Sequence, residues 1–87
     1  MKKEQLRAGR NYLQVSIKEF CNICNIGYST MTRLESGFGS LDCNFSTLEK
    51  INIFFQERGI EFETQGNEIG IKYNPENDKK KSEEGRN

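Results

Sequence analysis

The chain has 87 residues, which is enough for one small domain with a modest hydrophobic core. Leu, Ile, Val and Phe account for 20 of the 87 residues, and all of them precede residue 74. We therefore expect the folded unit to end near Tyr73, with a disordered polar tail over residues 74–87. The chain shows neither an apolar run long enough for a transmembrane helix nor the apolar segment of a signal peptide after Met1. The expected location is the cytoplasm, with no membrane partner.

The formal net charge is zero, but the charges are unevenly distributed. Residues 1–40 carry six basic and three acidic side chains, whereas the rest of the chain carries seven basic and ten acidic ones. If the protein binds an anion, one face of the basic front part is expected to do so.

The residue types needed for catalysis are scarce. Histidine, the commonest general base and metal ligand, is absent. Cys21 and Cys24 form a C-x-x-C pair, but Cys43 supplies only a third ligand and a structural zinc site needs four. No strand precedes the pair, unlike in redox motifs, so we expect small buried hydrophobic side chains. The expectation is no metal, no cofactor and no enzymatic activity; a redox or zinc protein is the minor alternative.

Three helices are expected in the first part of the chain. Apolar residues at helical spacing predict the first over residues 3–12. Ser16 and Glu19 form a capping box that opens the second, which must stop at residues 25–27 because Asn and Gly tolerate non-helical angles. The third is expected over residues 28–36, with its apolar positions pointing inward.

A fourth helix and a β-hairpin are expected next. Ser46 and Glu49 form a second capping box, which predicts a helix that runs to Arg58. Residues 60–64 and 69–73 then alternate between apolar and polar, as in strands. One register puts all apolar side chains on one face: Thr64 opposite Ile69, Phe62 opposite Ile71, Ile60 opposite Tyr73, and Glu61 opposite Lys72. The expected fold is mainly α: four to five helices in residues 1–58, followed by an antiparallel hairpin in residues 59–73.

The hairpin is also expected to form a homodimer interface. The apolar face of the hairpin is larger than a small domain would leave exposed. In addition, Phe54 and Phe55 lie on adjacent faces of the fourth helix, and one small core is not expected to bury both side chains. The expected interface residues are Phe55, Ile60, Phe62, Ile71 and Tyr73. In the competing arrangement, the hairpin folds back entirely onto its own helices and leaves a monomer.

Residues 16–37 are the most informative part of the sequence. Two helices joined by a tight turn, the second short and polar on its outside, are typical of a helix-turn-helix, whose second helix can enter the major groove. The segment resembles the phage repressor and Cro (Xre-type) helix-turn-helix family, and the resemblance extends over about residues 4–73. The matching positions are Phe20, Cys21, Ile26, Met31, Leu34 and Glu35.

This resemblance implies a sequence-specific DNA-binding transcriptional regulator, most simply a repressor, that binds an operator as a homodimer. The base-contacting residues that it implies are Tyr28, Ser29, Thr32 and Arg33. The phosphate-contacting residues are Ser16, Ile17, Lys18, Thr30, Ser36 and Ser40. It also implies a structural ion pair between Arg10 and Glu35.

The sequence departs from the family pattern at three positions, and alternatives stay open. Ile17 replaces a typical Gln, Asn25 replaces the Gly of the turn, and Gly27 replaces a Ser or Thr cap. Tyr28 can instead be partly buried beside the second helix, and Arg33 can form a surface ion pair with a Glu. The alternative function is an antitoxin or adaptor that binds a toxin or a second regulatory protein, using the acidic rear part or the tail.

Overall fold

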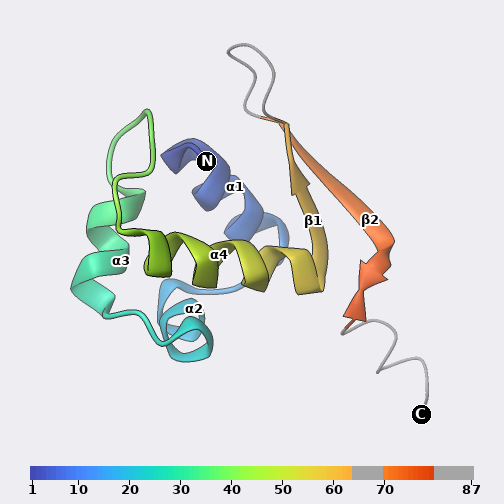
Figure 1. Ribbon diagram of the computed structural model, residues 1–87, viewed down its shortest axis with the longest axis horizontal. Coiled ribbons are helices and arrows are strands. Elements are labelled where there is room, and N and C mark those ends of the chain that lie inside the picture. The colour runs from blue at the N-terminus through green and yellow to red at the C-terminus, as the bar shows by residue number, and fades with distance from the viewer. Residues whose placement is uncertain (64–69, 80–87) are drawn as a thin grey trace.

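The computed structural model describes residues 1–63 and 70–79. Within them, four helices precede a two-stranded antiparallel sheet (Figure 1). The elements are α1 (Lys3–Tyr12), α2 (Ile17–Cys24), α3 (Tyr28–Glu35), α4 (Phe45–Glu57), β1 (Arg58–Phe62) and β2 (Ile71–Asp78). This order agrees with the expected mainly α fold with a hairpin after the helices.

The first three helices have the expected bounds to within one residue. α1 covers residues 3–12, and α3 ends at Glu35 rather than at residue 36. α2 begins after Ser16, whose Oγ accepts a hydrogen bond from the Glu19 amide at 3.1 Å. This bond satisfies one of the backbone donors that a helix start leaves without an intrahelical acceptor.

The start of α4 differs from the expectation. Its N-cap is Asn44, whose Oδ1 accepts a hydrogen bond from the Thr47 amide at 2.8 Å. Ser46 lies inside the first turn and donates its hydroxyl to the same Oδ1 at 3.1 Å. The predicted Ser46 cap is therefore wrong, because the side chain two residues earlier already occupies the capping position.

The strand register is confirmed where the structure describes it. Ile60 pairs with Tyr73, Glu61 with Lys72, and Phe62 with Ile71. The expected pairing of Thr64 with Ile69 lies outside the described residues.

The second strand is longer than expected. β1 follows α4 directly, and the register shifts between Arg58 and Ile60, where Gly59 has φ +76°. Arg58 pairs with Asp78, so β2 continues past Tyr73, where the tail was expected to begin. Backbone pairing and a hydrogen bond from the Tyr73 hydroxyl to Asp78 hold this segment despite its polar composition.

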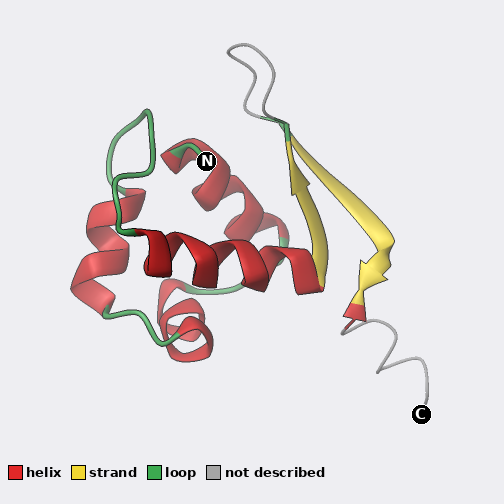
Figure 2. Cartoon of the chain, viewed as in Figure 1, coloured by secondary structure: helices red, strands yellow, loops and turns green. Residues whose placement is uncertain are grey.

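One core joins the helices and the sheet. In Figures 1 and 2, α4 crosses the molecule, and the sheet lies beside its C-terminal end. The Phe20 ring lies 4.4 Å from that of Phe54, and the Phe55 ring lies 5.0 Å from that of Phe62, measured between centroids. The buried hydrophobic residues are Leu6, Phe20, Cys21, Cys24, Ile26, Met31, Leu34, Ile51, Phe54, Phe55 and Ile60.

The core corrects part of the expected dimer interface. Phe54 and Phe55 are both buried: one packs on Phe20, and the other faces Gly9 of α1, where an added Cβ would lie 2.8 Å from its ring. Phe55 and Ile60 are 1% and 3% exposed, so neither is available to a second chain. The expectation that one small core does not hold both phenylalanines is wrong, because the hairpin itself supplies the missing cover. The other three expected interface residues, Phe62, Ile71 and Tyr73, are half-buried.

Candidate nucleic-acid interface

Residues 25–27 connect α2 to α3 and set the angle between them. Asn25 adopts the left-handed conformation at φ 56° and ψ 51°, which Asn tolerates because its short side chain can bond locally. Ile26 is buried and anchors the turn in the core, and Gly27 is the N-cap of α3 without a side-chain hydrogen bond. The turn therefore holds α3 against the domain and leaves one face of that helix free.

The free face of α3 carries the four residues expected to contact bases. Tyr28 is 58% exposed, and Ser29, Thr32 and Arg33 are exposed as well. The opposite face is buried through Met31 and Leu34. The structure thus brings the four side chains together on one polar surface.

The hydrogen bonds of this surface join residues that are close in the sequence. The Thr32 hydroxyl donates to the Ser29 carbonyl at 2.9 Å, and Arg33 Nη1 donates to the Asp42 carbonyl at 3.2 Å. Arg33 forms no ion pair with any residue in the described ranges, so the alternative of a surface pair with a Glu is not observed there. Tyr28 is more than half exposed, so most of its ring is open to solvent.

The residues expected to contact phosphates do not form one cluster. Ser16, Ile17 and Lys18 lie at the start of α2, with the Ile17 side chain half-buried against the core. Thr30, half-buried, lies in the first turn of α3. The other two candidates follow the C-terminal end of α3: Ser36 caps the helix, and Ser40 pairs with Lys2 through a β-bridge. Of these groups, Thr30 and Ser36 lie at opposite ends of α3 itself.

The basic residues of α1 contact the C-terminal end of α3, which sequence reasoning did not anticipate. Lys3 Nζ donates to the carbonyl of Arg33 at 3.2 Å and to that of Ser36 at 2.9 Å. Arg7 Nη1 donates to the carbonyls of Glu35 and Gly37. Cations at a helix C-terminus offset its partial negative charge. The only sequence signal for this role was the basic excess of residues 1–40.

The Arg7 guanidinium also lies 5.4 Å from the centre of the Phe38 ring, which is 82% exposed. Beside it, Glu4 Oε1 accepts a hydrogen bond from the Gly39 amide at 2.8 Å. This bond lowers the pKa of Glu4 below its usual value. Together these contacts tie the loop after α3 to α1.

The expected ion pair between Arg10 and Glu35 is present. Arg10 Nε donates to Glu35 Oε2 at 2.7 Å, and Nη2 donates to Oε1 at 2.9 Å. Arg10 Nη1 also donates to the Val15 carbonyl at 2.8 Å. The hydrogen bonds to Glu35 raise the pKa of Arg10 above its ordinary value. The pair links α1 to the last residue of α3 and so fixes the helix that carries the free face.

The cysteines lie in the core rather than at a site. Cys21 and Cys24 are each 8% exposed, and Cys43 is half-buried. Burial raises the pKa of Cys24 to about 11, which favours the unreactive thiol over the thiolate that metal binding and redox exchange require. In residues 1–63 and 70–79, no three His, Cys, Asp or Glu residues are grouped in a way that could hold a metal ion.

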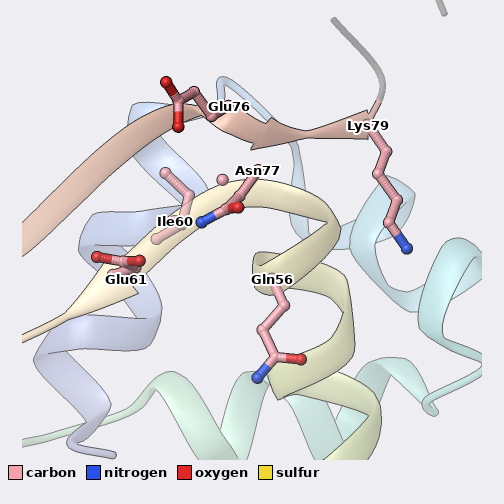
Figure 3. A pocket seen from close by; sticks show the side chains of 7 residues that line it. Gln56, Ile60, Glu61, Glu76, Asn77 and Lys79 are labelled. Atoms are coloured by element: carbon pink, nitrogen blue, oxygen red, sulfur yellow. The ribbon is translucent and has the colours of Figure 1, made fainter. Parts of the chain in front are cut away.

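A polar hollow of about 480 Å³ lies between the end of α4 and the two strands (Figure 3). Glu61, Glu76 and Lys79 line it, and Figure 3 shows that their charged groups point in different directions. The hollow therefore offers no converging set of groups for catalysis or for holding a charged ligand.

None of the helices in the described ranges has the length and apolar character needed to cross a membrane. The chain matches no protein-family model, and no significant similarity to a curated protein or to a solved structure was found.

Proposed function

We propose that this protein is a sequence-specific DNA-binding regulator that inserts α3 into the major groove of an operator. The observation that carries the proposal is the free face of α3, where Tyr28, Ser29, Thr32 and Arg33 are exposed on a helix whose other face is buried. The short turn at Asn25 between α2 and α3 supports the proposal, since a helix-turn-helix requires two helices joined by a tight turn.

The chemistry of this face suits direct readout of base edges. Arg33 can donate two hydrogen bonds to the O6 and N7 atoms of guanine, which is the commonest specific contact. The hydroxyls of Ser29 and Thr32 accept and donate, so they discriminate less strictly. Tyr28 can stack on a sugar or contact a thymine methyl. Arg33 would exchange its exposed bond to the Asp42 carbonyl for the base contact.

The surroundings of α3 favour a polyanion. Lys3 and Arg7 lie at its C-terminal end, and Lys18 is exposed near the start of α2. Neutralising phosphates releases condensed counterions, so affinity for DNA should fall as the salt concentration rises. One such module covers a half-site of a few base pairs, and two copies on a two-fold operator would give useful specificity. A protein held in this way over a promoter acts most simply as a repressor.

The first experiment is selection. Genomic fragments retained by the purified full-length protein are sequenced, and a shared sequence is expected among them. Fragments with no common sequence, or no binding at low salt, would overturn the proposal.

The second experiment compares Arg33→Ala with Lys72→Ala on the selected operator. Both variants lose one positive charge, but Lys72 lies on β2, away from α3. Losing a bidentate guanine contact costs about 1–3 kcal/mol of discrimination, so Arg33→Ala should lose most sequence preference while Lys72→Ala keeps it. Equal preference in both variants would show that Arg33 does not contact a base.

A further inference from the structure

A shallow groove lies between the last turn of α2 and the outer face of α4. Its volume is about 180 Å³, and its lining comes from Ile23 and Cys24 on α2 and from Lys50, Ile53 and Phe54 on α4, with Glu57 and Arg58 at one end. The Arg58 guanidinium covers the Phe54 ring at 3.8 Å and donates to the Phe54 carbonyl at 3.1 Å. The base of the groove is therefore formed by buried, well-packed groups.

Two aliphatic side chains in the groove remain exposed. Ile23 is 51% and Ile53 is 46% exposed, and each belongs to a different helix. Isolated exposed isoleucines are ordinary, but two that line one concave surface form a small apolar patch of the kind that partners cover.

The charges beside this patch follow a definite order along α4. Lys50, Ile53 and Glu57 recur at helical spacing and so share one face of the helix. Lys50 Nζ makes one long hydrogen bond, at 3.4 Å, to the Asn25 carbonyl. Glu57 is exposed, and its carboxylate forms no hydrogen bond or ion pair within residues 1–63 and 70–79. The stripe thus has a cation at one end, an aliphatic side chain in the middle and an anion at the other end.

We propose that a second copy of this chain covers the groove, with the two α4 helices packed antiparallel about a two-fold axis near Ile53. In a two-fold interface, the same patch is used twice and must complement itself. Antiparallel packing about this point places Lys50 of each copy opposite Glu57 of the other and brings the two Ile53 side chains together over the Ile23 patches. Parallel packing would instead place like charges together, which is unfavourable.

This surface differs from the expected hairpin interface, of which Phe55 and Ile60 are already buried within one chain. It also excludes the free face of α3, so the inference does not depend on DNA binding. All tests below are made without DNA, so their failure would leave the proposed function intact.

The first test is sedimentation of the full-length protein from about 1 μM to about 100 μM, a range that spans weak to moderate affinities. The wild type is expected to shift from the 10.1 kDa chain to twice that mass. Ile53→Lys should stay monomeric over this range. Phe45→Lys is the matched control, because it adds the same charge at an exposed apolar position of α4 outside the groove. A wild type that remains monomeric, or a dimer that survives Ile53→Lys, overturns the proposal.

The second test is a charge reversal. Lys50→Glu and Glu57→Lys should each weaken association at least about tenfold, since each places like charges opposite one another. The double variant again places opposite charges across the interface, with the two charges exchanged. It should return association to within a few-fold of the wild type. Circular dichroism confirms that each variant is folded. A double variant that stays as weak as the singles shows that the two residues do not meet across an interface.

Discussion

At the scale of single residues, Glu35 is a charged group buried at the end of α3. Its side chain is 7% exposed, and both of its carboxylate oxygens accept hydrogen bonds from Arg10. A buried carboxylate is costly unless its charge is matched and its oxygens are bonded. The pair therefore lets the end of α3 pack against α1 without an unsatisfied charge.

We expect Arg10→Ala and Glu35→Ala each to lower the free energy of unfolding markedly. Breaking a fully buried pair costs roughly 3–5 kcal/mol because the remaining charge stays buried, and we expect a smaller loss here because Arg10 is 14% exposed. The double variant should lose less than the sum of the singles, with a coupling of about 1–3 kcal/mol. Urea unfolding of the four proteins in a double-mutant cycle measures this coupling. Strictly additive losses would mean that the two side chains do not interact in solution.

Tyr73 gives a prediction about alkaline pH. Its hydroxyl donates to Asp78 Oδ2 at 2.7 Å, and this hydrogen bond, together with burial, raises the pKa of Tyr73 to about 12. Only the neutral phenol can donate, so the bond stabilises the fold fully below pH 10, the ordinary pKa, and is lost as the pH rises to about 12.

Thermal unfolding between pH 9 and pH 12 should therefore show a loss of stability that Tyr73→Phe lacks. Tyr28→Phe is the control, because it removes an exposed hydroxyl from α3 instead. The relevant quantity is the difference between each variant and the wild type at each pH, since other groups also titrate in this range. Parallel curves for the wild type and Tyr73→Phe would count against the hydrogen bond.

At the scale of elements, the start of α4 shows how two candidate caps are distinguished. Asn44 Oδ1 accepts from the Thr47 amide, whereas Ser46 lies within the helix and its hydroxyl donates to the same Oδ1. Local sequence favours both residues as caps, since Ser and Asn have similar preferences for this position. The tertiary structure sets the path of the segment before α4, and this path makes Asn44 rather than Ser46 the N-cap.

We expect Asn44→Ala to lower the free energy of unfolding by about 1 kcal/mol, the typical cost of losing an N-cap. Ser46→Ala, which leaves the capping bond to Thr47 in place, should cost much less. Urea unfolding under identical conditions compares the two variants. The opposite ranking would restore Ser46 as the cap.

At the scale of the whole molecule, the hairpin belongs to the same folded unit as the helices. Phe62 lies edge-on to Phe55, and the Tyr73 ring is 5.9 Å from that of Tyr12 on α1. Gln5, which is 2% exposed, donates its Nε2 to the Glu63 carbonyl at 2.6 Å. Removing the hairpin would expose these groups to solvent and take away the acceptor of the Gln5 amide.

A chain cut after Arg58 should therefore lose cooperative unfolding, whereas a chain cut after Lys79 should keep it. The first cut removes Ile60 and Phe62 from the core, and the second removes only residues 80–87. Urea titrations followed by near-ultraviolet circular dichroism compare the two chains with the full one. If the shorter chain unfolds as cooperatively as the full one, the helices are an independent domain.

The sequence by itself determined most of the element order. The bounds of α1 and α2, the left-handed turn at Asn25 and the register of Ile60 with Tyr73 agree with expectation. These features depend on local signals: periodicity, capping residues and the alternation of side chains along a strand. The four exposed residues of α3 could be placed on one face for the same reason, and the Arg10–Glu35 pair was expected from the family resemblance.

Only the tertiary structure decided the rest, because it depends on distances between segments far apart in the chain. The burial of both Phe54 and Phe55 required Gly9 and the hairpin to come close to α4. The contacts of Lys3 and Arg7 with the end of α3 span about thirty residues of sequence, and no local pattern encodes them. The extension of β2 to Asp78 likewise follows from pairing with Arg58, because a polar segment becomes a strand when a partner satisfies its backbone.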